Sequence, residues 1–436
     1  MIMSFFRTLL IGTMKEVDPG RMCVLTLPII IVSTVVLAGC EAVAPRGTAA
    51  SHADLPIHAL SAEDMPRSWR PYGSVHASLN QEPWTAAETE EAARAVRGGL
   101  AELTEFFDAN PESVLELKEN AVECFIDLTY SSSNMPDVRE TARRYALRNL
   151  RQLVNQRLRP GANPAECSEY PKLAMLSTYA HALYEEGDED LKQIIDLTNS
   201  ALEHCGSFDP DFQYILAADK APPQEVYSLL RWCYVLMDAQ TVPGLRISRN
   251  AKSLTPALWD FLEDYPLVPA RSYQEGGADP RFVATAYLAT HIGYMPTGYG
   301  RYPIYIEDAP WLYRFYRENF YEVLEHCEID LLAEFVDHFR HYGCTEENDL
   351  QTRDGARYLL RIYRQAGNSW MNHREPGEDA DNLQGYNLIH KPWTAIAGVR
   401  RRVVEPPLEG SYGALFRSAT GLRQFANVNP NREIHQ

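Results

Sequence analysis

Acidic and imidazole side chains recur at helical spacing within residues 329–342. Asp330, Glu334, Asp337, His338 and His341 follow one another at intervals of three or four residues, or directly, so a helix places them on one face. Such a face can ligate a metal ion, with Glu334 and His338 as ligands, or supply a general acid and base. The spacing matches neither HExxH nor the ligand pattern of di-iron bundles, which leaves the metal unknown. A solvated charged face is the default expectation.

Aromatic residues are concentrated in residues 287–321, which hold eleven of them. The chain average of 11% would put about four there. Glycines and prolines follow His291 and predict that a helix ends there and that an extended loop comes next. A ligand pocket can use the flat faces and hydroxyls of tyrosines; the candidate ligand-binding residues are Tyr294, Tyr299, Arg301 and Tyr302. The alternative is that His291 caps the helix and the tyrosines pack over the core.

A further imidazole, His390, stands just before Pro392, which suits the first turn of the last long helix. The candidate catalytic residues are therefore His291, Glu334 and His390, acting in acid/base or metal-assisted chemistry. The sequence contains no GxSxG, SxxK or recognisable Cys/His signature of a nucleophilic enzyme. If the three candidates lie within one site, an enzyme is favoured; if they are dispersed over the surface, a binding protein is favoured.

Helical patterns occupy nearly all of the chain from Trp84 onward, and breaks at Pro, Gly or Asp separate them. They cover residues 85–109, 112–129, 137–158, 169–186, 189–204, 222–239, 254–264, 280–292, 309–326, 329–342, 348–365 and 393–402. The alternating pattern of a strand has one short candidate, residues 301–306. The sequence therefore predicts an all-α fold of about a dozen helices.

Short breaks between successive helices predict antiparallel helical hairpins, arranged either as a closed (α/α) toroid or as an open solenoid. The absence of a TPR or ankyrin signature counts against a regular solenoid. Over residues 84–402 the chain resembles irregular (α/α)-toroid proteins of bacteria in helix number and spacing. Several of these handle carbohydrates or cyclise and cleave substrates, so the resemblance implies a site enclosed by the inner helix ends.

The resemblance extends to three short motifs of bacterial helical domains: a Thr-His helix end, an Asp-Leu-x-x-Glu helix and a late His-x-x-Thr. The corresponding positions are Thr290-His291, Asp330 to Glu334, and His390 to Thr394 with one extra residue. The extra residue departs from the pattern and puts the match at His390 in doubt.

Residues 22–39 carry no charge, and Lys15 and Arg21 precede them. This pattern is typical of an export signal, although a stretch of this length can also just span a bilayer. Leu37-Ala38-Gly39-Cys40 resembles the lipobox of bacterial lipoproteins. The resemblance implies cleavage before Cys40, lipidation of that cysteine and attachment to the lipid bilayer. Because Glu41 stands where an aspartate marks inner-membrane retention, it also implies the outer membrane.

The chain divides into four predicted parts: the export signal at 1–39, the lipidated cysteine with a flexible tether at 40–83, a helical domain at 84–405 and a C-terminal tail at 406–436. The 41 basic and 59 acidic residues give a net charge of −18. This charge argues against nucleic acid as a partner and against docking on anionic headgroups. We therefore expect the acyl chains to hold the protein at the membrane.

Six cysteines follow Cys40, and an even number in an oxidising compartment permits disulfides. The predicted pair is Cys327 with Cys344, because a single helix and its ends separate them. Free, buried thiols are the alternative, and no Cys/His cluster has the spacing of a zinc site.

Two functions remain open from the sequence. The preferred one is an envelope lipoprotein whose helical domain binds an envelope glycan, a peptide or a protein partner. The alternative is a toroid enzyme that cleaves a polysaccharide linkage by acid/base or metal-assisted chemistry. The sequence names no cofactor for either function.

Overall fold

The computed structural model describes the helical body of the chain. The described residues are 82–132, 134–159, 167–205, 213–217, 221–247, 251–270, 279–326, 328–375, 378, 384–401 and 410–422. The chain divides into two units, Met1–Leu55 and Pro56–Gln436, and every described residue belongs to the second. The predicted lipobox and nearly all of the predicted tether lie outside the described residues.

The described residues form helices and turns and no strand, so the predicted all-α fold is confirmed. One set of helices forms an inner layer: α4 (Asn120–Ser131), α6 (Tyr170–Leu183), α9 (Pro223–Ala239), α11 (Pro280–Thr297), α13 (Ile329–His341) and α15 (Tyr386–Val399). An outer set packs against it: α2 (Ala86–Ala109), α5 (Pro136–Arg157), α7 (Glu189–Cys205), α10 (Ala251–Glu263), α12 (Pro310–His326) and α14 (Leu350–Gln365). The shorter helices are α3 (Ser113–Leu117), α8 (Gln213–Leu216) and α16 (Tyr412–Thr420).

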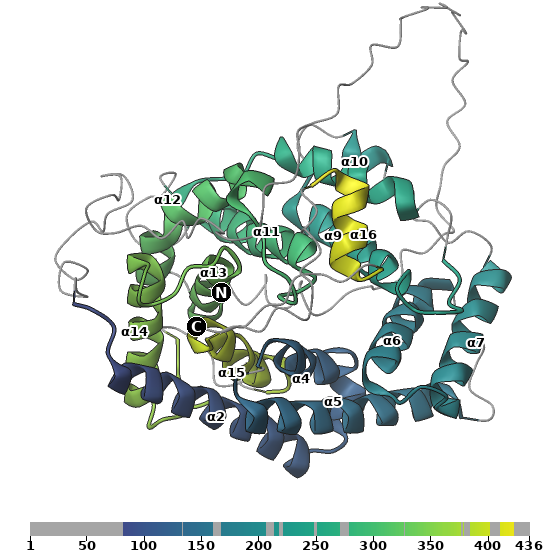
Figure 1. Cartoon of the computed structure of the whole chain (residues 1–436), viewed down its shortest axis with the longest axis horizontal. Helices are drawn as coiled ribbons and strands as arrows, with labels where there is room; N and C mark the ends of the chain where they lie inside the picture. The colour runs from purple at the N-terminus through teal and green to yellow at the C-terminus, as the bar shows by residue number, and fades with distance from the viewer. Residues whose placement is uncertain are drawn as a thin grey trace, which may run out of the picture. The chain divides into compact units, whose positions relative to one another are not determined.

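The helices of the inner layer form a closed ring (Figure 1). α6 packs on α9, α9 on α11, α11 on α13, and α13 on α15. α15 then returns to α4 and to α2, the first long helix of the domain. Between α4 and α6, the Tyr179 hydroxyl donates a 2.8 Å hydrogen bond to Glu123. Because the last inner helix contacts the first ones, the body is a toroid and not an open solenoid.

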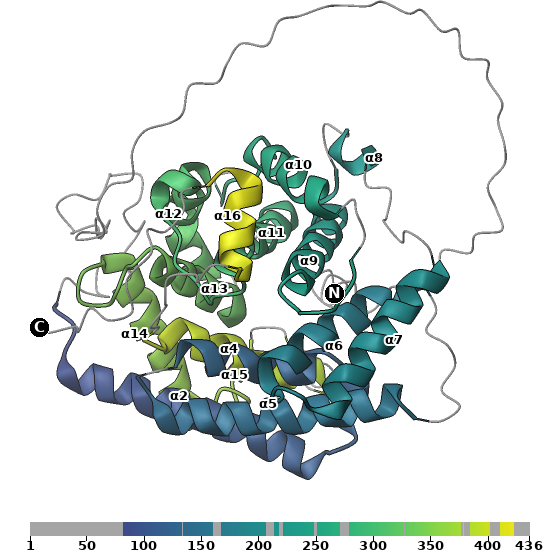
Figure 2. The same ribbon diagram turned by 45° about the vertical axis from the view of Figure 1, so that its right-hand side comes forward.

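Successive helices form hairpins, in which an outer helix covers the back of its inner partner (Figure 2). α5 lies between α4 and α6, and α14 lies between α13 and α15. The inner helices are consequently buried on more than one side, and every residue of α13 is buried. α7, by contrast, keeps only Ile194, Thr198, Asn199 and Ala201 buried, as expected of an amphipathic helix at the surface.

α16 extends the helical domain past the predicted boundary at residue 405. It packs against α9, α10 and α11, and the Tyr412 hydroxyl donates to the Met295 carbonyl at 2.8 Å. Arg417 is fully buried and pairs with Asp308 at 2.7 Å. The described part of the predicted tail is therefore an integral element of the domain. Among the described residues, no helix is both long enough and apolar enough to cross a membrane.

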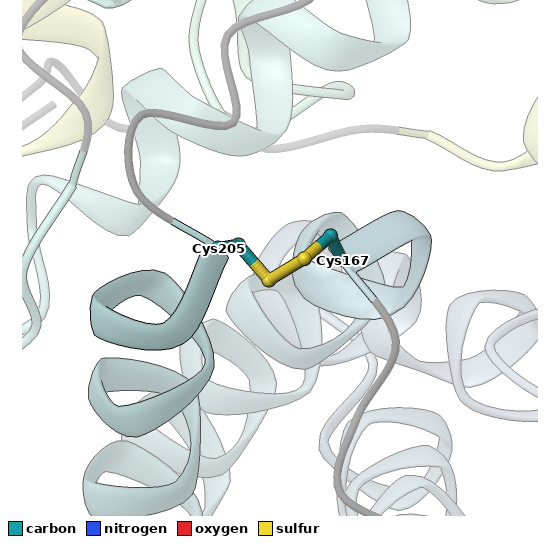
Figure 3. The surroundings of a disulfide bond; sticks show 2 residues. All are labelled: Cys167 and Cys205. Atoms are coloured by element: carbon teal, nitrogen blue, oxygen red, sulfur yellow. A yellow bond between two sulfur atoms is a disulfide. The ribbon is translucent and has the colours of Figure 1, made fainter.

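The predicted disulfide between Cys327 and Cys344 is wrong. A disulfide joins Cys167, in the turn before α6, to Cys205 at the end of α7, with Cα atoms 5.5 Å apart (Figure 3). Cys344 is a buried free thiol, and Cys327 lies outside the described residues. The prediction failed because α13 separates the two positions. Thirteen helical residues span roughly 20 Å, whereas a disulfide needs Cα atoms about 4.4–6.8 Å apart.

Candidate active site

The acidic and imidazole face of α13 points into the protein. Asp330, Glu334, Asp337, His338 and His341 are each at most 6% exposed, so the default expectation of a solvated face is wrong. The apolar face of the same helix is buried as well, because α12 and α14 cover it while α11 and α15 lie beside it. The polar residues therefore meet side chains from neighbouring inner helices.

Glu334 contacts the hydroxyl of Thr290 on α11. The Thr290 hydroxyl donates to Oε2 of Glu334 at 2.6 Å and also lies 2.7 Å from the carbonyl oxygen of Tyr287. The hydroxyl has a single proton, so the two acceptors share it.

Burial decides the protonation state of Glu334. It raises the pKa of this carboxyl to about 8; the hydrogen bond from Thr290 lowers the pKa, and the nearby Asp330 and Asp337 carboxylates raise it. At neutral pH Glu334 is therefore a neutral acid able to give up a proton.

α11 continues past the predicted end at His291 and stops only at Thr297, where Gly298 adopts a left-handed conformation. The helix passes through Gly293 because it approaches α13 closely there: a Cβ atom would lie 2.6 Å from His338. Because α11 extends to Thr297, one helical face carries Tyr287, His291 and Tyr294 at positions i, i+4 and i+7. The sequence had predicted that a helix and a loop would divide these residues.

His291 is neutral in this setting. Its Nδ1 donates to the Tyr287 carbonyl oxygen at 2.8 Å, which leaves Nε2 as an acceptor. Burial lowers the pKa of His291 to about 4, and the neighbouring Arg231 and His390 contribute to the decrease. The ring of Tyr227 from α9 meets the imidazole edge-on, with ring centroids 4.6 Å apart.

His390 reaches the same place from α15. That helix begins at Tyr386, earlier than predicted, so His390 lies within it and not before it. Nδ1 of His390 lies 3.4 Å from Oδ2 of Asp330, whose other oxygen accepts a 2.8 Å hydrogen bond from the Tyr287 hydroxyl. The ring of His390 stacks on Tyr386 with centroids 4.8 Å apart. A carboxylate on one nitrogen orients an imidazole and stabilises its protonated form.

The three predicted catalytic residues therefore come together. Thr290 touches Glu334 and lies 3.4 Å from Nδ1 of His291. Asp330 connects His390 to the same face of α13, one turn before Glu334. This convergence is the geometry expected of an enzyme.

The predicted ligand-binding residues separate into two groups. Tyr294 and Tyr299 stack with ring centroids 5.3 Å apart, and both are half-buried. Tyr299 has a left-handed backbone with φ of 55°, an unusual conformation for a bulky residue that often marks a functional position. Burial raises the pKa of Tyr299, Arg231 lowers it and Glu334 raises it. Tyr299 therefore lies near the catalytic candidates.

Arg301 and Tyr302 have a different environment. Arg301 donates to Asp238 at 2.9 Å, to the Tyr234 hydroxyl at 2.8 Å and to the Gly298 carbonyl at 2.8 Å. Its guanidinium also lies 5.9 Å from the centre of the Tyr302 ring. Since its donors already have partners within the protein, Arg301 stabilises the loop after α11, and its predicted role in ligand binding is not supported.

Other residues of the site were not predicted from the sequence because they lie on different helices: Glu123 on α4, Tyr179 on α6, Tyr227 and Arg231 on α9, and Tyr386 on α15. One signal was available. Arg231, four residues after Tyr227, stands in the apolar run from Leu229 to Met237 of α9, and a charged residue is unusual in a helix in a core.

We call the residues that meet inside the ring the inner cluster. It consists of Glu123, Tyr179, Tyr227, Arg231, Tyr287, Thr290, His291, Tyr294, Tyr299, Asp330, Glu334, Tyr386, His390 and Trp393. Each inner helix contributes at least one member. Most members are only half-buried although they are far inside the domain, so they keep surface that a ligand can reach.

The described residues contain no group of three or more His, Cys, Asp or Glu side chains placed to hold a metal ion. No family model, curated protein or solved structure matches the chain. The chemistry of the inner cluster must therefore be inferred from its own residues.

Proposed function

We propose that this protein is an envelope enzyme that cleaves a linkage in a saccharide chain by acid/base chemistry within the inner cluster. The observation that carries the proposal is the meeting of a buried, protonated Glu334 with two imidazoles, His291 and His390, that keep accessible surface. Groups whose environments hold them in opposite protonation states are what acid and base catalysis requires.

Each residue has a distinct role in this proposal. Glu334 gives its proton to the glycosidic oxygen as the bond to the leaving sugar breaks. His390 accepts, as a neutral imidazole, the proton of the attacking water, whose oxygen bonds to the anomeric carbon, and Asp330 stabilises the imidazolium that forms. If the reaction is instead an elimination, His390 accepts a proton from a ring carbon and no water is added. His291 accepts a hydrogen bond from a substrate hydroxyl through Nε2.

The aromatic members of the inner cluster support a saccharide as the substrate. Tyr227, Tyr294, Tyr299, Tyr386 and Trp393 are all half-buried. Flat apolar faces stack on sugar rings, and phenolic hydroxyls exchange hydrogen bonds with sugar hydroxyls.

The proposed cellular context is the outer membrane, with the acylated Cys40 as the anchor. This context rests on the lipobox and on the export signal before it. An envelope glycan is then the saccharide within reach of the tethered domain.

The test is incubation of the mature protein with purified bacterial envelope polysaccharides, followed by mass spectrometry of the products. Hydrolysis adds one water to each product pair, whereas elimination adds none. We expect Glu334→Gln and His390→Asn to lower turnover by about 10²–10⁴-fold, while Asp354→Asn, a substitution of a buried acid between α12 and α14, leaves it unchanged. Turnover should also fall as the pH rises through about 8, where Glu334 loses its proton. Binding without any product would support the alternative, a glycan-binding lipoprotein.

A further inference from the structure

Arg231 is an interior arginine whose hydrogen-bond donors are largely unused. Its side chain is 36% exposed, and the carboxylate nearest to it among the described residues belongs to Glu123, at 3.9 Å. That distance is an ion-pair contact beyond hydrogen-bond length. Glu123 instead accepts a 2.8 Å hydrogen bond from the Tyr179 hydroxyl. The Tyr227 hydroxyl oxygen accepts a further hydrogen bond from Arg231, so Tyr227 and Glu123 together engage only part of the five N–H donors of the guanidinium.

Other buried arginines of the domain have a carboxylate within hydrogen-bond distance of the guanidinium group. Arg317 lies 2.7 Å from Asp349, Arg340 lies 2.7 Å from Glu346, and Arg417 lies 2.7 Å from Asp308. These side chains are at most 3% exposed. Arg231 differs from them in both respects, since it has a distant carboxylate and keeps accessible surface. An arginine that only stabilised the fold would be expected to resemble the others.

The charges around Arg231 leave room for an anion. Glu334 is neutral at pH 7 because its pKa is about 8. The Asp330 carboxylate is occupied by the Tyr287 hydroxyl and lies beside His390. The positive charge of Arg231 lowers the pKa of His291. An anionic group that approaches Arg231 therefore meets a positive charge whose nearest carboxylate, Glu123, lies beyond hydrogen-bond length, while Glu334 is neutral.

The groups next to Arg231 suit a sugar that carries this anion. Tyr227 lies one turn before it on α9, and the pKa of Arg231 is raised by both Tyr227 and Tyr299. A planar guanidinium forms paired hydrogen bonds with a carboxylate, while tyrosine rings support the sugar ring beside it.

We infer that Arg231 binds a carboxylate of the substrate, so that the inner cluster takes an acidic saccharide containing uronic acid residues. This inference rests on the proposed function and adds the substrate class to it. Glu123 then competes weakly with the ligand for the guanidinium, and Tyr179 holds Glu123 in place.

The experiment measures binding of the full mature chain to three matched probes by calorimetry. The probes are a uronic acid oligosaccharide, its methyl ester and the corresponding neutral oligosaccharide. We expect the acid to bind about 10–100-fold more tightly than the ester or the neutral compound, the range typical of hydrogen bonds to a charged group. Arg231→Gln should remove that difference, Arg231→Lys should keep part of it, and Arg94→Gln, on the exposed face of α2, should leave it intact.

Glu123→Gln provides a second, independent measurement. Because it removes the competing carboxylate, it should increase the affinity for the acid. If the Arg231–Glu123 contact were purely structural, Glu123→Gln would lower the melting temperature and leave the acid's affinity unchanged or lower.

The outcomes separate the two proposals. Equal affinity of the wild-type chain for the acid, ester and neutral probes would overturn the inference, and this comparison does not depend on whether any variant folds. Cleavage of neutral polysaccharides would then still support the proposed enzyme. If no saccharide is bound or cleaved, the proposed function fails together with the inference.

Discussion

Glu334→Gln should make the protein more stable at neutral pH, although it removes the proposed catalytic acid. Burial raises the pKa of Glu334 from 4.5 to about 8. The folded protein therefore keeps a proton that the unfolded chain releases between these two values. Whenever the folded state binds more protons than the unfolded state, the free energy of unfolding falls as the pH rises.

The size of the effect follows from the width of that pH window. One pKa unit corresponds to about 1.36 kcal/mol. Wild-type protein at pH 7 is about 2.5 units above the unfolded pKa and so loses roughly 3 kcal/mol relative to low pH. Above pH 8 the loss approaches about 5 kcal/mol. Glutamine does not titrate, and its amide oxygen can accept the hydrogen bond from Thr290 that the carboxyl group accepts.

The assay is urea denaturation of wild-type and Glu334→Gln protein at a series of pH values from about 5 to about 8.5, read as the free energy of unfolding. The variant should gain stability relative to wild type as the pH rises. Asp354→Asn is the matched control. Burial raises the pKa of Asp354 to about 7, so this variant should also lose less stability with rising pH, while its turnover stays normal. Parallel pH curves for wild type and Glu334→Gln would show that Glu334 is ionised in the folded protein and would refute the assigned role.

Further predictions concern the disulfide, the helix contact behind the site and the anchor. Cys205→Ser opens a loop of 38 residues and should lower the free energy of unfolding by about 4 kcal/mol in the chain-entropy model. Thiol labelling of denatured, unreduced wild-type protein should modify Cys344, and protection of Cys344 would contradict its assignment as a free thiol. Gly293→Ala places a methyl group 2.5 Å from the Tyr316 hydroxyl and 2.6 Å from His338, so thermal denaturation should show a loss of about 1–3 kcal/mol, accompanied by reduced turnover. Cys40→Ser should abolish acylation and release the body from membranes; continued membrane association of the processed variant, measured by fractionation, would mean that something else anchors the chain.

Much of the helical architecture follows from local patterns in the sequence. Apolar residues at helical spacing, with breaks at Pro and Gly, predicted α5, α7, α12 and α14 within a few residues of their ends. The same reasoning failed at His291, because a Gly/Pro-rich stretch normally ends a helix. α11 continues because Gly293 lets it approach His338 closely, a contact between segments distant in the chain.

The sequence by itself determined that His291, Glu334 and His390 are the groups capable of acid/base chemistry, and that Asp330 shares a helical face with Glu334. Only the tertiary structure decided that this face is interior, that burial keeps Glu334 protonated, and that Glu123 and Arg231 face the same cluster. The physical reason is that periodicity reports which residues share a face of a helix, whereas burial and pKa depend on what packs against that face. In a closed ring the packing comes from helices far away in the chain, and no local pattern specifies it.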